Sequence, residues 1–294
     1  MAELTPAQIA QFHEDGYLIL PALFSAEEIK RMAAEANDIL DLCLNTTLAR
    51  GEIDCRLDVQ LRGGKLNIRK VQPINDLSDY LREVSQDERL VGPLRQLMDN
   101  QEPMLMEEKL NYKQLLHQSL DTAAFSVQEY GDVFALHHDW GYYRQQGYPG
   151  ATLSSAVSID DSTTKNGPLR VVPGSHKSDW PTLNPDPQSG DGRVSEELFD
   201  EAQRVPCLAP AGSVMLFHSK LLHDSCANNS GQPRRIMIYS HYPGNHQAEP
   251  DQRNRYGREL AQSQENQYRA LVQAGKYQDQ FHAANEPQTT GSTL

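Results

Sequence analysis

The amino-acid sequence predicts a mainly β fold with flanking helices, in which an antiparallel β-sandwich forms the core. Three observations lead to this prediction. Apolar residues recur at helical spacing only towards the two ends of the chain, and from about Leu105 short apolar, β-branched runs alternate with Gly, Pro, Asn and Asp. The 294 residues, 38% of them hydrophobic, can bury a large core, so disorder as the main state is excluded.

Two helices are expected at the start of the chain, because two capping boxes precede apolar residues at helical spacing. Thr5 and Ser25 each stand three residues before a Gln or Glu. The second helix should span residues 25–42. Two further short helices are predicted within residues 76–98, with an interruption near Gly92-Pro93.

Strands are expected in the middle of the chain, in short runs bounded by turn residues. The expected segments are residues 123–130, 134–140, 151–159, 168–174, 213–219 and 234–242. Residues 193–204 are typical of one helical insertion between strands. No internal repeat or flexible linker divides the chain, so we expect a single domain, residues 1–294. It would comprise a helical N-terminal part (1–104), the β core (105–245) and a helical C-terminal extension (246–294).

Composition excludes several classes of protein. The 40 acidic residues outnumber the 27 Lys plus Arg, and the formal charge of −13 opposes binding to nucleic acid or anionic lipid. No apolar run approaches the roughly 20 residues of a membrane-spanning helix. The N-terminal segment lacks the features of a secretory signal, and four scattered cysteines form no CxxC motif. We therefore expect a cytoplasmic protein with no nucleic-acid or membrane partner.

Three polar features of the predicted β region point to metal chemistry. In FALHHDW, His137 and Asp139 stand two residues apart, so in a strand they would face one side while His138 faces the other. His223 ends the apolar segment SVMLFHSKLLH, and we expect it to approach them where the sandwich brings two strands face to face. Two His and one carboxylate on one side of a metal are typical of non-haem Fe(II) oxygenases.

The third feature is Arg234 with Arg235, which open the last predicted strand. A guanidinium binds a carboxylate through two parallel hydrogen bonds, and an oxygenase of this kind needs such a group for the far end of an α-keto acid. Each feature alone is weak evidence, since a strand His or Arg is more commonly structural. The ordered set is a stronger indication.

This ordered set resembles the phytanoyl-CoA dioxygenase family of Fe(II)- and 2-oxoglutarate-dependent oxygenases. The resemblance runs from about Gln8 to Pro243. It rests on FHEDGYLILPALFSAEEI, RKVQPI, LNYK, HHD, NGPLRVVPGSHK, AGSVMLFH and HDSCANNSGQPRR. It implies a double-stranded β-helix, the cupin-like jelly roll. It also implies hydroxylation of a substrate with O2, with Fe(II) as cofactor and 2-oxoglutarate as cosubstrate, and release of succinate and CO2.

The resemblance assigns roles to individual residues. The metal ligands would be His137, Asp139 and His223. The cosubstrate would be bound by Arg234, Ser225, Lys70 and Ser158, with Arg235 facing away. Two positions depart from the family pattern, since Ala156 replaces a Trp of some relatives and Lys109 replaces a pocket Met. Related halogenases carry a small residue where this chain has Asp139, so halogenation is not expected.

Other residues near these motifs have two interpretations each. Asn111, Lys113, Trp140 and Tyr142 are candidates for substrate binding, and each is equally compatible with a structural role. We interpret the PGSH segment with His176 as a turn rather than a second metal motif. Asn166-Gly167 is expected to be a hairpin turn.

The favoured function is hydroxylation of a small molecule. The alternative is a non-catalytic, cupin-like metal-binding scaffold or sensor, against which the retained Arg234 argues, and an oxygenase acting on a protein side chain ranks lower. A CoA thioester, an amino acid, an ectoine-like solute, a phosphonate and a natural-product intermediate all remain compatible as substrates. Lys109, Lys113, Arg144 and Lys165 could form a basic entrance for a CoA thioester. The sequence does not specify an oligomeric state.

Overall fold

The computed structural model describes residues 3–125, 127, 131–186, 190–247 and 252–286. In chain order its helices and strands are α1 (Pro6–Asp15), β1 (Tyr17–Leu20), α2 (Ala26–Arg50), β2 (Leu57–Arg62), β3 (Lys65–Val71), α3 (Asp79–Val84), α4 (Glu88–Leu97), β4 (Pro103–Leu115), β5 (Phe134–His137), α5 (Trp140–Tyr143), β6 (Leu153–Ser158), β7 (Leu169–Val171), β8 (Val205–Pro206), β9 (Val214–His218), β10 (His223–Ser225), β11 (Ile236–Pro243) and α6 (Gln252–Gln273). The predicted class, mainly β with flanking helices, is confirmed.

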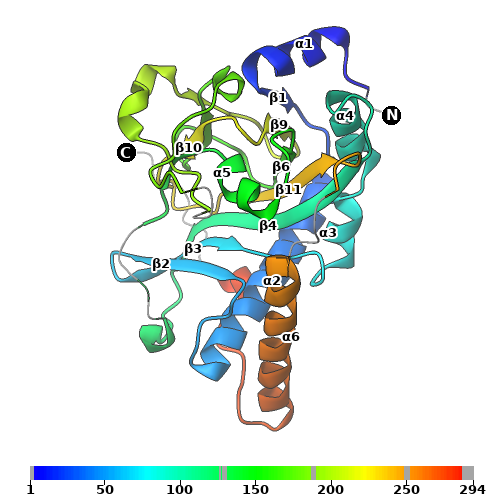
Figure 1. Ribbon diagram of the computed structural model, residues 1–294. Helices are drawn as coiled ribbons and strands as arrows, with labels where there is room; N and C mark the ends of the chain where they lie inside the picture. Colours follow the sequence, from blue (N-terminus) through cyan, green and yellow to red (C-terminus); the bar gives the residue numbers. More distant parts are fainter. Residues whose placement is uncertain (1–2, 126, 128–130, 187–189, 248–251, 287–294) are drawn as a thin grey trace.

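Two antiparallel sheets form the centre of the described chain (Figure 1). The larger has the strand order β1-β9-β6-β11-β4-β3-β2, and the smaller has the order β5-β10-β7-β8. Neighbours in each sheet are far apart in sequence, since β11 pairs with both β4 and β6, and β10 pairs with both β5 and β7. The chain therefore closes its core through long-range pairing.

The two expected N-terminal helices form as predicted. Thr5 and Ser25 each close a capping box that satisfies free backbone N–H groups. The second helix, α2, continues past residue 42 to Arg50, where Gly51 adopts the left-handed conformation that ends helices. The break between α3 and α4 lies at residues 85–87, not at Gly92-Pro93, because the Asp87 side chain caps α4 and Pro93 is accommodated within it.

The N-terminal part is not only helical, which corrects the expectation for residues 1–104. It contributes β1, β2 and β3 to the larger sheet. β2 and β3 form a hairpin around Gly63-Gly64, both at positive φ, and a Gly-Gly pair between two alternating runs is a recognised hairpin signal. β1 pairs with β9, with Tyr17 opposite Phe217. No local sequence pattern predicts this pairing, because the two strands are far apart in the chain.

Three further expectations are corrected or restricted. Residues 193–204 form two 3-10 turns, Glu196–Leu198 and Glu201–Gln203, because the side chains of Ser195 and Asp200 each cap a new turn. Asn166-Gly167 joins β6 to β7, which lie in different sheets, so it is a turn but not a hairpin. Half of the strand expected at 123–130 falls outside the described residues, and Thr122–Ala124 form a 3-10 turn.

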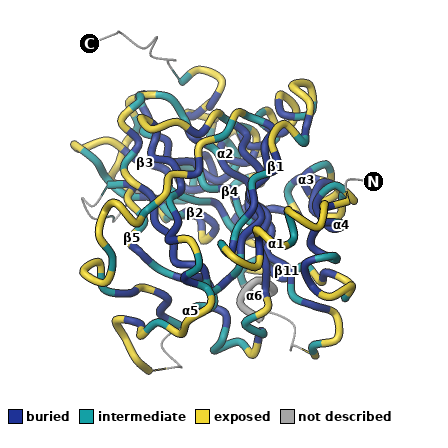
Figure 2. Tube along the Cα trace, turned by 90° about the horizontal axis from the view of Figure 1, so that it is seen from above, coloured by how far each residue is buried: buried dark blue, intermediate teal, exposed yellow. Residues whose placement is uncertain are grey.

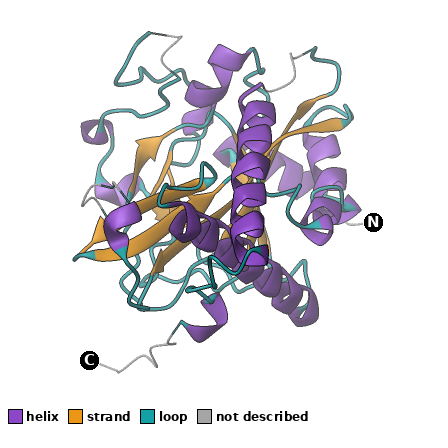
Figure 3. Cartoon of the chain, turned by 90° about the horizontal axis from the view of Figure 1, so that it is seen from below, coloured by secondary structure: helices purple, strands orange, loops and turns teal. Residues whose placement is uncertain are grey.

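Helices cover the larger sheet on the face opposite the smaller one (Figure 3). Met32, Ala36 and Leu40 of α2 are fully buried, and the Tyr112 hydroxyl of β4 donates to the backbone oxygen of Ala36 at 2.6 Å. Seen along the chain trace, burial is greatest at the centre, where α2 crosses the strands (Figure 2). In the part of the chain that is described, no helix combines the length and the apolar character needed to span a membrane.

The C-terminal extension is tied to α2 by one buried amide. The Asn45 side chain donates to the backbone oxygens of Asp41 and Phe281, at 2.9 and 2.8 Å. Its Oδ1 accepts from the Tyr277 hydroxyl and from the backbone N–H groups of Gln280 and Phe281. A single side chain therefore satisfies five partners and holds the segment after α6 in place.

We predict that Asn45→Ala destabilises the protein by about 2–4 kcal/mol, because several buried groups lose their partners together. Urea unfolding measures the loss, and amide hydrogen exchange should accelerate at residues 280–281. Asn45→Asp keeps the acceptor oxygen and should preserve more of this protection than Asn45→Ala. Unchanged exchange in Asn45→Ala would contradict the assigned role of this amide.

Candidate metal and cosubstrate site

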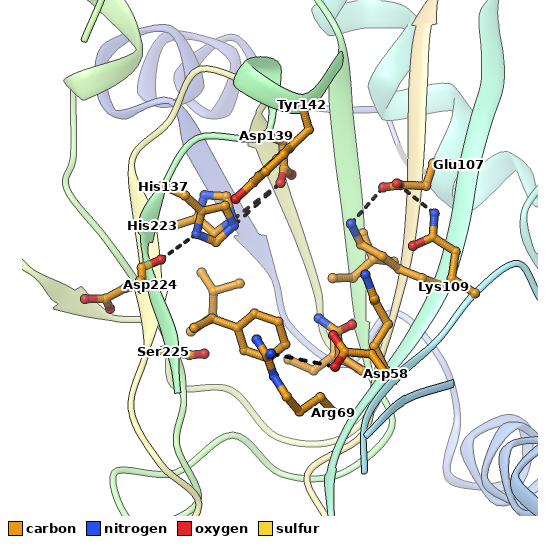
Figure 4. A pocket seen from close by; sticks show the side chains of 18 of the residues that line it. Asp58, Arg69, Glu107, Lys109, His137, Asp139, Tyr142, His223, Asp224 and Ser225 are labelled. Atoms are coloured by element: carbon orange, nitrogen blue, oxygen red, sulfur yellow. Dashed lines mark hydrogen bonds and ion pairs between the residues drawn. The ribbon is translucent and has the colours of Figure 1, made fainter. Parts of the chain in front are cut away.

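A cavity of about 930 Å³ lies between the two sheets. Its walls come from β3, β4, β9 and β11 of the larger sheet and from β5, β7 and β10 of the smaller one, and Gly257 of α6 borders it. Figure 4 shows that polar side chains from both sheets point into this space. The cavity is therefore the place where the chemistry-bearing residues meet.

His137, Asp139 and His223 lie together at one end of this cavity. Their candidate ligand atoms all lie within 4.8 Å of one another. The Nε2 atoms of His137 and His223 lie 3.7 and 3.8 Å from the same oxygen of Asp139, and the ring centroids are 4.1 Å apart. Among the described residues this is the one group of three potential metal ligands.

The way the fold assembles this group differs from the expectation in two respects. His223 starts the short strand β10 and is the direct cross-strand partner of His137, so both lie in one sheet and not on facing sheets. Asp139 lies beyond the end of β5, with helical φ and ψ of −63° and −33°, so a chain turn brings it beside His137. His138 faces away, as expected, and its Nδ1 accepts from the Gly141 N–H.

Backbone hydrogen bonds orient both imidazoles. Nδ1 of His137 lies 2.7 Å from the Ala135 oxygen, and Nδ1 of His223 lies 2.9 Å from the Leu221 oxygen. A carbonyl only accepts, so each Nδ1 carries the proton and each Nε2 presents its lone pair towards Asp139. Burial, together with the neighbouring His223, holds the pKa of His137 well below its usual value. Two imidazoles with bonded Nδ1 atoms and a nearby carboxylate fit a divalent metal of the Fe(II) type.

Arg234 is a buried cation on the wall of the same cavity. One Nη donates to the Gly167 oxygen at 2.9 Å, and Nε is buried with no partner. No described carboxylate pairs with this guanidinium, and burial lowers its pKa to about 10. Because an uncompensated buried charge is costly, this arrangement favours an anionic ligand.

Arg235 points to the opposite face of β11, as predicted. It forms two hydrogen bonds with the Asp160 carboxylate, at 2.8 and 2.9 Å, and also contacts α2 through Asn37. The alternation along the strand therefore places one arginine in the cavity and the other against the helical layer.

The remaining predicted residues divide into two groups. The side chains that line the cavity are Lys70, Asn111, Tyr142 and Ser225. Those that do not line it are Lys113, Trp140 and Ser158. Lys113 is buried, donates to the Cys226 oxygen and borders a second cavity. Trp140 lies beneath the Lys220 ammonium, 4.6 Å from its ring centroid, and Ser158 is buried beside Ile236.

Asn111 and Tyr142 offer polar atoms to a ligand. The Asn111 Oδ1 atom is buried with no hydrogen-bond partner. The Tyr142 ring lies 5.9 Å from that of His137, and burial raises the pKa of its hydroxyl to about 12, which keeps it protonated. His176, in contrast, belongs to a 3-10 turn outside the metal group, as the interpretation of PGSH expected.

Glu107 was not among the residues expected here, whereas Lys109 lies in the cavity, as its match to a pocket Met implied, and not only at the entrance. Lys109 Nζ lies 2.7 Å from the Glu107 carboxylate, and both line the cavity. Glu107 also accepts from the Tyr143 hydroxyl and from Gln72, at 2.7 and 2.9 Å. Burial alone would raise the pKa of Glu107, but the charge and hydrogen bond of Lys109 lower it to about 2. The alternation in MEEKLNY could have placed both residues on one strand face.

Most charged side chains in the cavity wall are in ion pairs with other protein side chains. Leaving aside His137, Asp139 and His223, the ion-paired side chains are those of Arg56, Asp58, Arg69, Glu107, Lys109, Arg193 and Asp224. Arg234 and Lys70 have no ion-pair partner among the described residues. Burial and the nearby Lys109 lower the pKa of Lys70. The charges of the cavity wall therefore favour the binding of negatively charged ligands.

Comparison with known proteins agrees with this geometry. Residues 12–236 match the family model described as Phytanoyl-CoA dioxygenase (PhyH). The ectoine dioxygenase of Halomonas elongata is 28% identical over 252 residues, which cover 80% of this chain and 69% of that protein. The L-proline trans-4-hydroxylase of Streptomyces griseoviridis is 26% identical, covering 82% of this chain and 87% of that protein.

A solved structure supports the fold independently. EctD from S. alaskensis with 2-oxoglutarate and 5-hydroxyectoine superposes with a TM-score of 0.61, covering 84% of this chain and 79% of that chain at 24% identity. The two-sheet core, the group of two His and one Asp, and a family match over most of the sequence lead to the same classification. The chain belongs to the phytanoyl-CoA dioxygenase family of Fe(II)- and 2-oxoglutarate-dependent oxygenases.

Proposed function

We propose that this dioxygenase hydroxylates a small molecule at a C–H bond and that residues 1–294 act as one catalytic domain. One observation carries the proposal: the buried Arg234, which has no carboxylate partner in the described part of the chain, shares a cavity with the group of His137, Asp139 and His223. A metal scaffold has no need for an unpaired buried guanidinium. The alternative of a non-catalytic cupin-like protein leaves this cation unexplained.

His137, Asp139 and His223 would hold Fe(II). All three line the cavity, so a metal held by them would be reached by a cosubstrate and O2 from the cavity. When bound, Fe(II) with 2-oxoglutarate and O2 supplies the oxidation of a substrate C–H bond, with succinate and CO2 as coproducts. Asp139 as third ligand favours hydroxylation over halogenation, because it occupies the position that a halide needs.

Arg234 would bind the distal carboxylate of 2-oxoglutarate. The Gly167 oxygen holds one Nη, so the guanidinium plane is set before the ligand arrives. Ser225 lines the same part of the cavity and would donate its hydroxyl, and Lys70 would add a second positive charge. Ser158 does not line the cavity, so it would act on the cosubstrate only through its neighbours.

A small substrate is favoured because its binding space lies within the fold. The cavity between the sheets also has to hold the metal and 2-oxoglutarate, and Tyr142 and Asn111 provide polar contacts beside them. Lys113 and Trp140 face elsewhere, so they would affect substrate binding only through the surrounding structure.

The first test addresses the metal ligands. His137→Ala, Asp139→Ala and His223→Ala should each weaken Fe(II) binding by more than the roughly 10- to 100-fold that loss of an outer hydrogen-bond partner costs. Anaerobic equilibrium dialysis measures the iron bound per protein. His176→Ala serves as the control histidine and should bind iron normally. A triad variant with normal iron content would remove that residue from the ligand set.

The second test separates the enzyme from the scaffold. Arg234→Lys should weaken 2-oxoglutarate binding by about 10- to 100-fold, equivalent to 1.5–3 kcal/mol, because the ammonium cannot form two parallel hydrogen bonds. The absorption band of the anaerobic Fe(II)·2-oxoglutarate complex reports the affinity. Arg235→Lys, on the opposite face, should leave that affinity unchanged. If the wild-type protein binds iron but not 2-oxoglutarate, the scaffold becomes the better account.

The third test addresses the support of Arg234. Gly167 has a φ of +69°, and a Cβ there would lie 2.4 Å from the Cys226 oxygen. Gly167→Ala should therefore lower the free energy of unfolding by about 1–3 kcal/mol, in addition to the cost of an alanine at positive φ. It should also weaken 2-oxoglutarate binding, because the Gly167 oxygen holds the Arg234 guanidinium. Gly275→Ala is a matched control, with a φ of +66° and no atom in reach of a Cβ, and should lose about 1–2 kcal/mol only. Equal losses in urea unfolding would contradict the role of this close contact.

A further inference from the structure

We infer that the substrate carries an anionic group, a carboxylate or a phosphonate-type oxyanion, and that Lys109 anchors this group in the cavity. The inference rests on the proposed function and deepens it, because it names the chemical class of the substrate and the residue that selects it. The proposed roles of the metal ligands and of Arg234 do not depend on it.

Lys109 is held in one position by a chain of hydrogen bonds. Its Nζ pairs with Glu107, which also accepts from Tyr143 and Gln72. The Tyr143 hydroxyl lies 3.2 Å from that of Ser240, and Ser240 lies 2.8 Å from Ser154. These contacts extend from β4 across β11 to β6, so they fix the Glu107 carboxylate to which the ammonium is bonded.

The ammonium still has donors to offer. A lysine Nζ carries three N–H groups, and Glu107 is the only hydrogen-bond partner of Lys109 among the described residues. The side chain lines the cavity, so its other donors are available to a ligand there. Asp139 and Tyr142 both influence the charge of Lys109, which places it on the side of the cavity next to the metal group.

A purely structural ion pair is a poor explanation for this arrangement. The free-energy cost of removing two charges from water offsets most of their mutual attraction. A protein with two apolar side chains of similar size in their place is commonly as stable. Glu107 accepts from three donors, whereas Lys109, with three N–H groups, has one partner among the described residues. The pair therefore presents a fixed, partly unused cation, which suits recognition of an anion.

The charge balance of the cavity favours one negative charge on the substrate. Asp139 and the two carboxylates of 2-oxoglutarate are balanced by Fe(II) and Arg234, and the other charged wall residues are in ion pairs. The charge of Lys70 remains. Lys70, which the proposed function places beside the cosubstrate, is close enough to Lys109 for that ammonium to lower the pKa of Lys70, and an anionic group bound to Lys109 would reduce this repulsion. A neutral ligand would leave the remaining positive charge and the repulsion between the two lysines in place.

The test titrates the protein of residues 1–294, loaded anaerobically with Fe(II) and 2-oxoglutarate, with matched pairs of an acid and its amide or ester. The probes are acetate with acetamide, L-proline with L-prolinamide, and methylphosphonate with its dimethyl ester. Binding is read from the change in the Fe(II)·2-oxoglutarate absorption band. In the wild type, at least one acid should bind about tenfold or more tightly than its amide or ester partner, because only the acid offers an oxyanion to the ammonium.

Lys109→Met should weaken binding of that acid by about 10- to 100-fold, the loss of one charge-assisted hydrogen bond, while 2-oxoglutarate binding stays unchanged. Lys109→Met leaves the Glu107 carboxylate without its ion-pair partner. The double variant Glu107→Gln with Lys109→Met removes both charges, so it measures the loss of acid binding without an added negative charge in the cavity wall. Lys165→Met, an exposed lysine outside the cavity, controls for net charge.

The outcomes separate the two proposals. If the wild type binds 2-oxoglutarate but no acid perturbs the band, or if amides match their acids, the anion site is absent and this inference is overturned. The same holds if acid binding survives in both Lys109 variants. If the wild type fails to bind 2-oxoglutarate at all, the proposed function fails instead.

Discussion

The antiparallel pairing of β5 with β10 is the constraint on which the site depends. It places His137 and His223 directly opposite each other, and their Nδ1 atoms are held by backbone oxygens on the same two segments. Since both imidazoles are fixed before any metal binds, only Asp139 has to be brought in, and the turn into α5 does this. A shift of β10 by one residue would turn His223 out of the cavity and remove the site.

The second organising feature is a set of positively charged side chains in the cavity that are not neutralised by described carboxylates. The chain is acidic overall, at −13, yet Arg234 and Lys70 face the cavity without a pairing carboxylate among the described residues, and Lys109 is only partly used. Buried charge is costly unless a ligand compensates it, so these residues lower the stability of the empty protein. That cost is consistent with a cavity shaped for 2-oxoglutarate and an anionic substrate.

The helical layer supports this arrangement from behind. α2 packs against β4 and β11, whose inner faces carry Lys109, Asn111 and Arg234. Arg235, one residue after Arg234, is anchored to Asp160 and to α2, which fixes the register of the strand and with it the direction of Arg234. The packed outer face thus determines which side chains reach the cavity.

The sequence by itself determined the class of fold and the capping boxes of α1 and α2, and it predicted that His137, Asp139, His223 and Arg234 share a site, because these inferences depend on local spacing and on an ordered set of motifs. It did not reveal that β1 pairs with β9 or that His223 pairs with His137, since both contacts join segments far apart in the chain. Lys109 illustrates the difference best. The resemblance gave it a pocket position and its charge suggested an entrance, but only the tertiary structure shows that it pairs with Glu107, which Tyr143 holds in turn. Burial and partners, which decide what an ionisable side chain does, are properties of the tertiary structure.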